Sequence, residues 1–114
     1  MSECPVDLTH LGRYTGDDKT LNGEILRLFD DQATQMVNAL RAILADRDHA
    51  RWKEITRAIQ SAARGVGAQA FGEAAAAAEP LDITHAQTRA EDALAALSHE
   101  SLALRHWLAT YLAA

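Results

Sequence analysis

Residues 52–68 carry apolar side chains at spacings of three and four residues, which predicts an amphipathic helix. The apolar stripe consists of Trp52, Ile55, Ile59, Ala62 and Val66. Because a helix turns by about 100° per residue, Arg57 falls nearly opposite this stripe. Four polar or basic residues share its outward half, namely Lys53, Gln60, Ser61 and Arg64. We therefore expect this helix to present a basic, polar surface.

The same periodicity extends along most of the chain. Asp7 can cap a short helix that ends near Thr15, and a second helix is expected over residues 18–46. Asp48 can cap the third helix, which ends around Gly65 and Gly67. A fourth helix is expected over residues 68–79, where Pro80 ends it, and a fifth over residues 84–112.

Two further apolar stripes belong to the long second and fifth helices. The stripe of the second helix is predicted to be Ile25, Leu28, Phe29, Ala33, Met36, Leu40, Ile43 and Leu44. That of the fifth is Ala90, Leu94, Leu97, Ser101, Leu104, Leu108 and Tyr111. No segment has the alternation of a strand. Short loops between long helices predict an all-α, single-domain, up-down antiparallel four-helix bundle with a short additional N-terminal helix.

Composition agrees with helices and limits the compartment. Apolar residues make up 48% of the 114 residues but aromatic residues only 5%, so the core must be built from small and aliphatic side chains. The single Cys4 cannot form an internal disulfide and suits a reducing cytosol. No apolar run approaches the roughly 20 residues that span a bilayer, and the N-terminus lacks the pattern of a signal peptide. We expect a cytoplasmic protein that does not enter a membrane.

Charge is distributed unevenly along the chain. The net charge of −5 argues against nucleic acid as the main partner. Residues 47–68 nevertheless carry five basic and two acidic side chains, a local charge of +3. A solvated helix face would account for these cations. The alternative is a docking surface for an acidic partner.

The third predicted helix also carries a motif, which reads WKEITRAIQSAARGVGA over residues 52–68. It is preceded by an E-x-L-x-x-F element at Glu24, Leu26 and Phe29. Together these segments resemble the histidine-containing phosphotransfer domain family over residues 7–79. In that register the phospho-accepting histidine is replaced by Arg57.

Two further positions depart from the family pattern, and two retain it. Gln60 stands at the position of the lysine and Ser61 at that of the glycine, whereas the closing Gly67 and Ala68 agree. The resemblance implies a domain that exchanges phosphoryl groups with receiver domains. A guanidinium stays protonated and has no lone pair to offer as a nucleophile. We therefore expect no enzyme activity and no cofactor.

The expected function is that of a pseudo-phosphotransfer protein in bacterial two-component signalling. Its partner would be a response-regulator receiver domain or a hybrid histidine kinase, bound without carrying phosphate. Receiver active sites concentrate carboxylates, which complement a basic surface. The predicted partner-binding residues are Lys53, Arg57, Gln60, Ser61 and Arg64. A monomer is expected rather than a dimer.

Two alternatives stay open. Phosphotransfer could use another histidine, of which the chain has five: His10, His49, His85, His99 and His106. Of these, His99 and His106 are seven residues apart, but a metal site would need further ligands at matched positions. The second alternative is a structural or oligomerising helical module that uses an apolar surface around Trp107.

Overall fold

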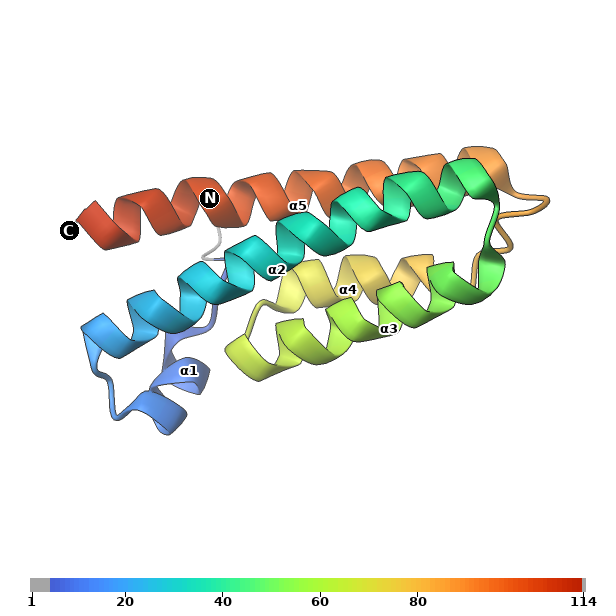
Figure 1. The fold of residues 1–114 in the computed structure, drawn as a ribbon. Coiled ribbons are helices and arrows are strands. Elements are labelled where there is room, and N and C mark those ends of the chain that lie inside the picture. The colour runs from blue at the N-terminus through green and yellow to red at the C-terminus, as the bar shows by residue number, and fades with distance from the viewer. Residues whose placement is uncertain (1–4, 114) are drawn as a thin grey trace.

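The computed structural model describes residues 5–113, and this part of the chain is all-helical (Figure 1). Five helices pack together within it, in the order α1 (Leu8–Thr15), α2 (Lys19–Asp46), α3 (His49–Val66), α4 (Gln69–Ala78) and α5 (Gln87–Ala113). The predicted all-α class is confirmed. Cys4 lies outside the described residues.

The four longer helices contact one another in a closed order. α2 packs against α3 and α5, and α4 packs against the same two helices. Consecutive helices from α2 to α5 run in opposite directions (Figure 1). Because α2 has 28 residues and α5 has 27, whereas α3 has 18 and α4 has 10, the long pair extends past the short pair. α1 contacts α2 and α3.

Side-chain and backbone caps account for the helix bounds. Asp7, Asp18 and Asp48 each accept a backbone hydrogen bond at the start of α1, α2 and α3. Gly67 ends α3 with a φ of 78°, a left-handed conformation that favours glycine. A Cβ at Gly67 would also lie 3.1 Å from the backbone oxygen of Asp7, so this glycine permits the close approach of the N-terminal segment.

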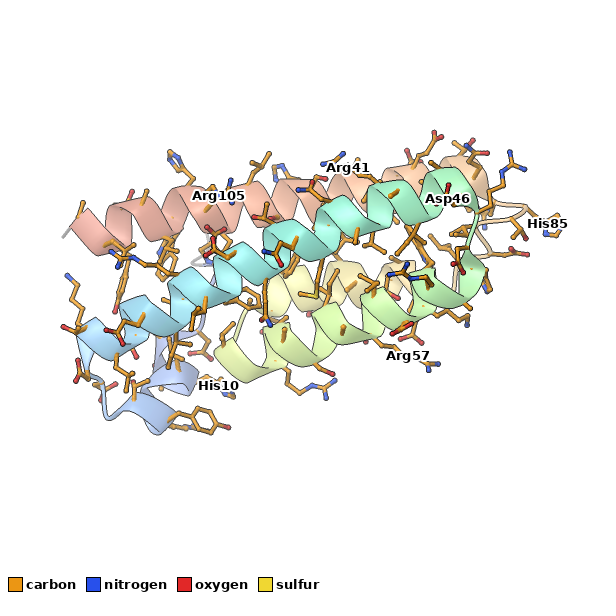
Figure 2. The ribbon with its side chains drawn as sticks, in the orientation of Figure 1. His10, Arg41, Asp46, Arg57, His85 and Arg105 are labelled. Atoms are coloured by element: carbon orange, nitrogen blue, oxygen red, sulfur yellow. The ribbon has the colours of Figure 1, made fainter. Side chains whose placement is uncertain are left out.

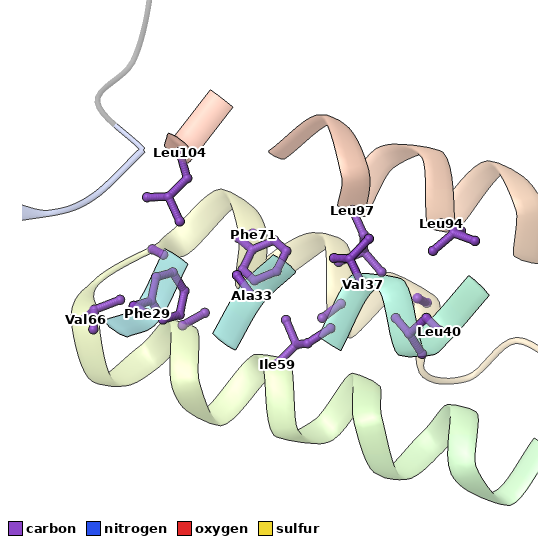
Figure 3. Packing of buried hydrophobic residues seen from close by; sticks show 14 of the residues in the cluster. Phe29, Ala33, Val37, Leu40, Ile59, Val66, Phe71, Leu94, Leu97 and Leu104 are labelled. Carbon is purple, nitrogen blue, oxygen red and sulfur yellow. The ribbon is translucent and has the colours of Figure 1, made fainter. Parts of the chain in front are cut away.

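The core lies between the four longer helices (Figure 3). Its centre contains Phe29 of α2 and Phe71 of α4, whose rings meet edge to face at 6.0 Å between centroids. Leu97 and Leu104 of α5 cover the other side, and Ile59 of α3 is fully buried. Alanines on the inner face of α4 are buried in the core as well.

The predicted apolar stripe of α2 includes one residue that is exposed and omits two residues that are buried. Leu28 is 69% exposed, whereas Leu26 and Val37 are buried. Leu28 lies about 200° around the helix from Leu26, at 100° per residue, so the two cannot face the same core. Ile25 and Met36 are only partly buried.

The buried face of α3 is rotated about the helix axis relative to the predicted apolar stripe. Thr56 and Ala63 are buried, while Ile55 and Ala62 are only partly buried. The rotation brings α3 into contact with α4 as well as α2. Thr56 can be buried because its hydroxyl donates to the carbonyl oxygen of Trp52 at 2.9 Å.

α5 begins three residues later than predicted. Thr84 belongs to a turn in which the carboxylate of Asp82 accepts hydrogen bonds from its backbone and hydroxyl, and the helix starts at Gln87. The predicted stripe of α5 is otherwise confirmed, except that Tyr111 is partly buried. None of the described helices combines the length and the hydrophobicity needed to cross a lipid bilayer.

Candidate partner-binding site

All five residues predicted to bind a partner lie on α3. Arg57, Ser61 and Arg64 are exposed, and Lys53 and Gln60 are half-buried. Arg57 has 67% of its side chain exposed and projects from the outer side of α3 (Figure 2). The predicted outward placement of Arg57 is therefore confirmed.

A carboxylate from the end of α4 joins two of these positions. Glu79 Oε2 lies 3.3 Å from Nε of Arg57, and Glu79 Oε1 accepts a hydrogen bond of 2.8 Å from Nε2 of Gln60. Gln60 also donates to the carbonyl oxygen of Thr56 at 3.3 Å. Arg57 and Gln60 are thus both held by one acidic side chain.

The environment of Glu79 favours its charged form. The hydrogen bond from Gln60, followed by the hydrogen bond and positive charge of Arg57, holds the pKa of Glu79 below its ordinary value of 4.5. Lys53 adds a weaker attraction, and partial desolvation opposes these effects. The outward surface of α3 that carries Lys53, Arg57 and Arg64, called here the basic surface, therefore has the negative charge of Glu79 beside it.

A buried tryptophan fixes the end of α4 beside α3. The indole Nε1 of Trp52 donates a hydrogen bond of 2.9 Å to the carbonyl oxygen of Ala78, the last residue of α4. The last carbonyls of a helix lack partners within it, so this bond satisfies one of them. Glu79 follows directly and continues the helical bonding, because its N–H donates to Ala75 at 3.0 Å.

A shallow groove adjoins the basic surface of α3 near Arg64. It has a volume of about 330 Å³ and is bordered by Gln60 and Arg64 on α3 and by Gly72 and Glu73 on α4. His10 of α1 also lines the groove, and its Nε2 is buried without a hydrogen-bond partner among the described residues. The basic surface of α3 is therefore continuous with a groove between α3 and α4.

The other histidines lie apart from Arg57 along the chain. His49 is the first residue of α3, with its Nδ1 buried and unpartnered among residues 5–113. His85 is exposed in the turn before α5 and pairs with Asp82 at 2.8 Å. His99 and His106 are exposed on α5. Within the described part of the chain, no three His, Cys, Asp or Glu side chains gather as a metal site would require.

Trp107 packs on the bundle rather than standing free. Its ring stacks on that of Tyr111 at 5.1 Å between centroids, and both residues contact the core. Among residues 5–113, the large apolar side chains classed as exposed are Tyr14, Leu21, Leu28 and Leu102.

Sequence reasoning missed Glu79, although a signal for it was available. In an antiparallel pair of helices that turns at Gly67, residues equally far from the turn lie opposite one another. Arg57 lies ten residues before Gly67 and Ala77 ten residues after it, so this count places the last residues of α4 opposite Arg57. Whether Glu79 itself reaches Arg57 and Gln60 depends on how α3 and α4 are rotated against each other.

The exposed guanidinium groups of α3 can bind anions. Arg57 cannot act as a nucleophile, and Ser61 makes no hydrogen bond with any described residue, so no base activates its hydroxyl. A guanidinium with free N–H groups can bind carboxylates or phosphates. Comparison of the chain with protein-family models, with curated proteins and with solved structures found no match.

Proposed function

We propose that this chain is a degenerate relative of the histidine-containing phosphotransfer domains that binds a receiver domain or a hybrid histidine kinase without carrying phosphate. Its four longer helices would form the up-down antiparallel four-helix bundle of such domains, with α1 as the additional N-terminal helix. The protein would act in the cytoplasm in two-component signalling.

The observation that carries this proposal is the exposure of Arg57 at the register of the phospho-accepting histidine. A histidine there must reach into the active site of another protein, so its position has to face solvent. Arg57, with 67% of its side chain exposed, meets that requirement. The guanidinium cannot accept a phosphoryl group, which leaves binding as the activity of this surface.

Charge complementarity supports a receiver as the partner. The Nε of Arg57 faces Glu79, and the guanidinium carries further N–H donors that point in other directions. Arg64 makes no hydrogen bond or ion pair with any described residue. These donors fit the clustered carboxylates of a receiver active site. Such binding would compete with active phosphotransfer proteins or hold the receiver in one state.

The test uses purified receiver domains from the same organism, with and without Mg²⁺ and acetyl phosphate. Saturable binding of at least one receiver is expected, together with no transfer of acid-labile phosphate to this chain. Failure of every receiver and kinase to bind would refute the proposal. Transfer of label to the chain, lost when His49 is replaced, would instead establish phosphotransfer through another histidine.

A further inference from the structure

A second polar groove lies between α2 and α5, away from the basic surface of α3. It has a volume of about 220 Å³. The residues that line it include two arginines and four neutral polar side chains but no carboxylate: Thr34, Val37, Asn38, Arg41, Ser98, Ser101, Leu102 and Arg105. Figure 2 shows Arg41 and Arg105 along the same α2–α5 side of the molecule. The groove is thus lined by hydrogen-bonding groups and bordered by positive charge.

Ser101 borders this groove, and its hydroxyl group is open to it. The residue is only 7% exposed, yet its Oγ makes no hydrogen bond with any residue in the described part of the chain. Ser101 Oγ is not one of the buried side-chain atoms that lack a partner in the described part of the chain, so the hydroxyl is accessible from the groove. It can therefore donate a hydrogen bond to a polar group bound there.

The two arginines cross the groove from opposite walls. Arg41 of α2 donates through Nη2 to Ser98 Oγ of α5 at 2.8 Å. Arg105 of α5 donates through Nη2 to Thr34 Oγ1 of α2 at 2.7 Å, and its Nε lies 3.3 Å from Asp30. These contacts orient both guanidinium groups and leave other N–H donors of each group unused. Asp30 offsets one of the two charges, so the groove keeps a net positive charge.

We propose that this groove binds a tetrahedral oxyanion, either phosphate or a phosphate monoester. Donors converge from both walls and include hydroxyl, amide and guanidinium groups, which suits an anion with acceptors in several directions. Sites for drug-sized ligands occupy about 300–1,000 Å³, so a groove of about 220 Å³ fits a small head group. Leu102, which is 64% exposed at the groove, can contact the organic part of an ester.

The test is a calorimetric titration of the full chain with inorganic phosphate and with phenyl phosphate, at constant ionic strength and with sodium chloride as the blank. Saturable binding of at least one probe is expected. Ser101→Ala and Arg41→Gln should each weaken binding at least fivefold. Arg89→Gln, on the exposed side of α5, is the matched control and should leave binding unchanged. Ser101→Ala should retain the fold because alanine favours helices, and thermal unfolding checks this.

The outcomes separate the two sources of the anion. Tighter binding of phenyl phosphate that is lost in Leu102→Ala identifies a phosphate monoester, whereas equal binding of both probes identifies free phosphate. Absence of saturable binding would overturn the inference. Equal weakening by Arg89→Gln, or equally tight binding of acetate, would also overturn it, because net charge alone would then explain the effect. None of these results depends on receiver binding, since no residue of this groove belongs to α3.

Discussion

The indole Nε1 of Trp52 and the carbonyl oxygen of Ala78 form a buried hydrogen bond of 2.9 Å that joins the start of α3 to the end of α4. The next residue, Glu79, is thereby held beside Arg57 and Gln60. This buried contact thus helps to place the negative charge of Glu79 on the surface proposed to bind a partner. Removing it should affect both stability and that surface.

We expect Trp52→Phe to destabilise the protein strongly. The substitution leaves the Ala78 carbonyl unsatisfied, which costs about 1–3 kcal/mol, and the smaller ring adds the cost of a cavity. Urea unfolding followed by circular dichroism measures the loss. Trp107→Phe is the control: Trp107 is only partly buried, so its loss should stay below about 1 kcal/mol. Equal losses in the two variants would show that the Trp52 hydrogen bond contributes little.

The pKa of Glu79 predicts a pH-dependent contribution to stability. Its pKa in the folded protein lies below the ordinary value of 4.5, so the folded state favours the carboxylate. The resulting stabilisation is present above pH 4.5 and is lost as the pH falls from there through the lowered pKa. Glu79→Gln should therefore be less stable than the wild type at pH 7, and the difference should vanish in acid.

Urea midpoints of both proteins between pH 7 and pH 3 test this expectation. Asp82, whose pKa is also lowered, mainly by the hydrogen bond from Thr84, titrates in both proteins and cancels in the comparison. A difference between the two proteins that stays constant across this range would mean that the carboxylate of Glu79 is not stabilised by its neighbours.

The helix order and most helix bounds could be predicted because their causes are local. Asp7, Asp48 and Gly67 cap helices through contacts within a few residues along the chain. The stripe of α2 was partly wrong because Leu28 and Leu26 are both apolar, and only the position of the neighbouring helices decides which is buried. Glu79 was missed for a similar reason, since its contacts depend on how α3 and α4 are rotated against each other.

Arg57→Glu tests the proposed docking surface. If Arg57 meets an acidic receiver pocket, reversal of its charge should weaken binding at least about tenfold, which corresponds to about 1.4 kcal/mol. Higher salt should also weaken the wild-type complex, mainly through the association rate. Glu79→Gln should act in the opposite direction and strengthen binding, because it frees Arg57 from its internal partner.

Surface plasmon resonance with a receiver domain that binds the wild-type chain measures these effects, with Arg89→Glu as the control. Arg89 is exposed on α5, so reversing its charge should change affinity little. Equal weakening by Arg57→Glu and Arg89→Glu would indicate non-specific electrostatics. No weakening by either would place the interface elsewhere and favour the helical-module alternative.

Introducing the complete phosphotransfer motif tests whether the α3 surface has the geometry for phosphotransfer. The triple variant Arg57→His, Gln60→Lys and Ser61→Gly places an imidazole at an exposed position of α3. We expect partial uptake of phosphate from a phosphorylated receiver, measured as acid-labile label on the chain. Glycine at position 61 costs up to about 1 kcal/mol of helix propensity, which a domain of ordinary stability tolerates.

Glu79 adds a condition to this experiment, because its carboxylate remains beside positions 57 and 60. A lysine at position 60 would pair with Glu79, and the negative charge would oppose an incoming phosphoryl group. Adding Glu79→Gln to the triple variant should therefore increase the labelling. The matched control carries the same changes but keeps Arg57 and should stay unlabelled. If the folded quadruple variant accepts no phosphate from any receiver that binds it, the register that equates Arg57 with the phospho-accepting histidine is wrong.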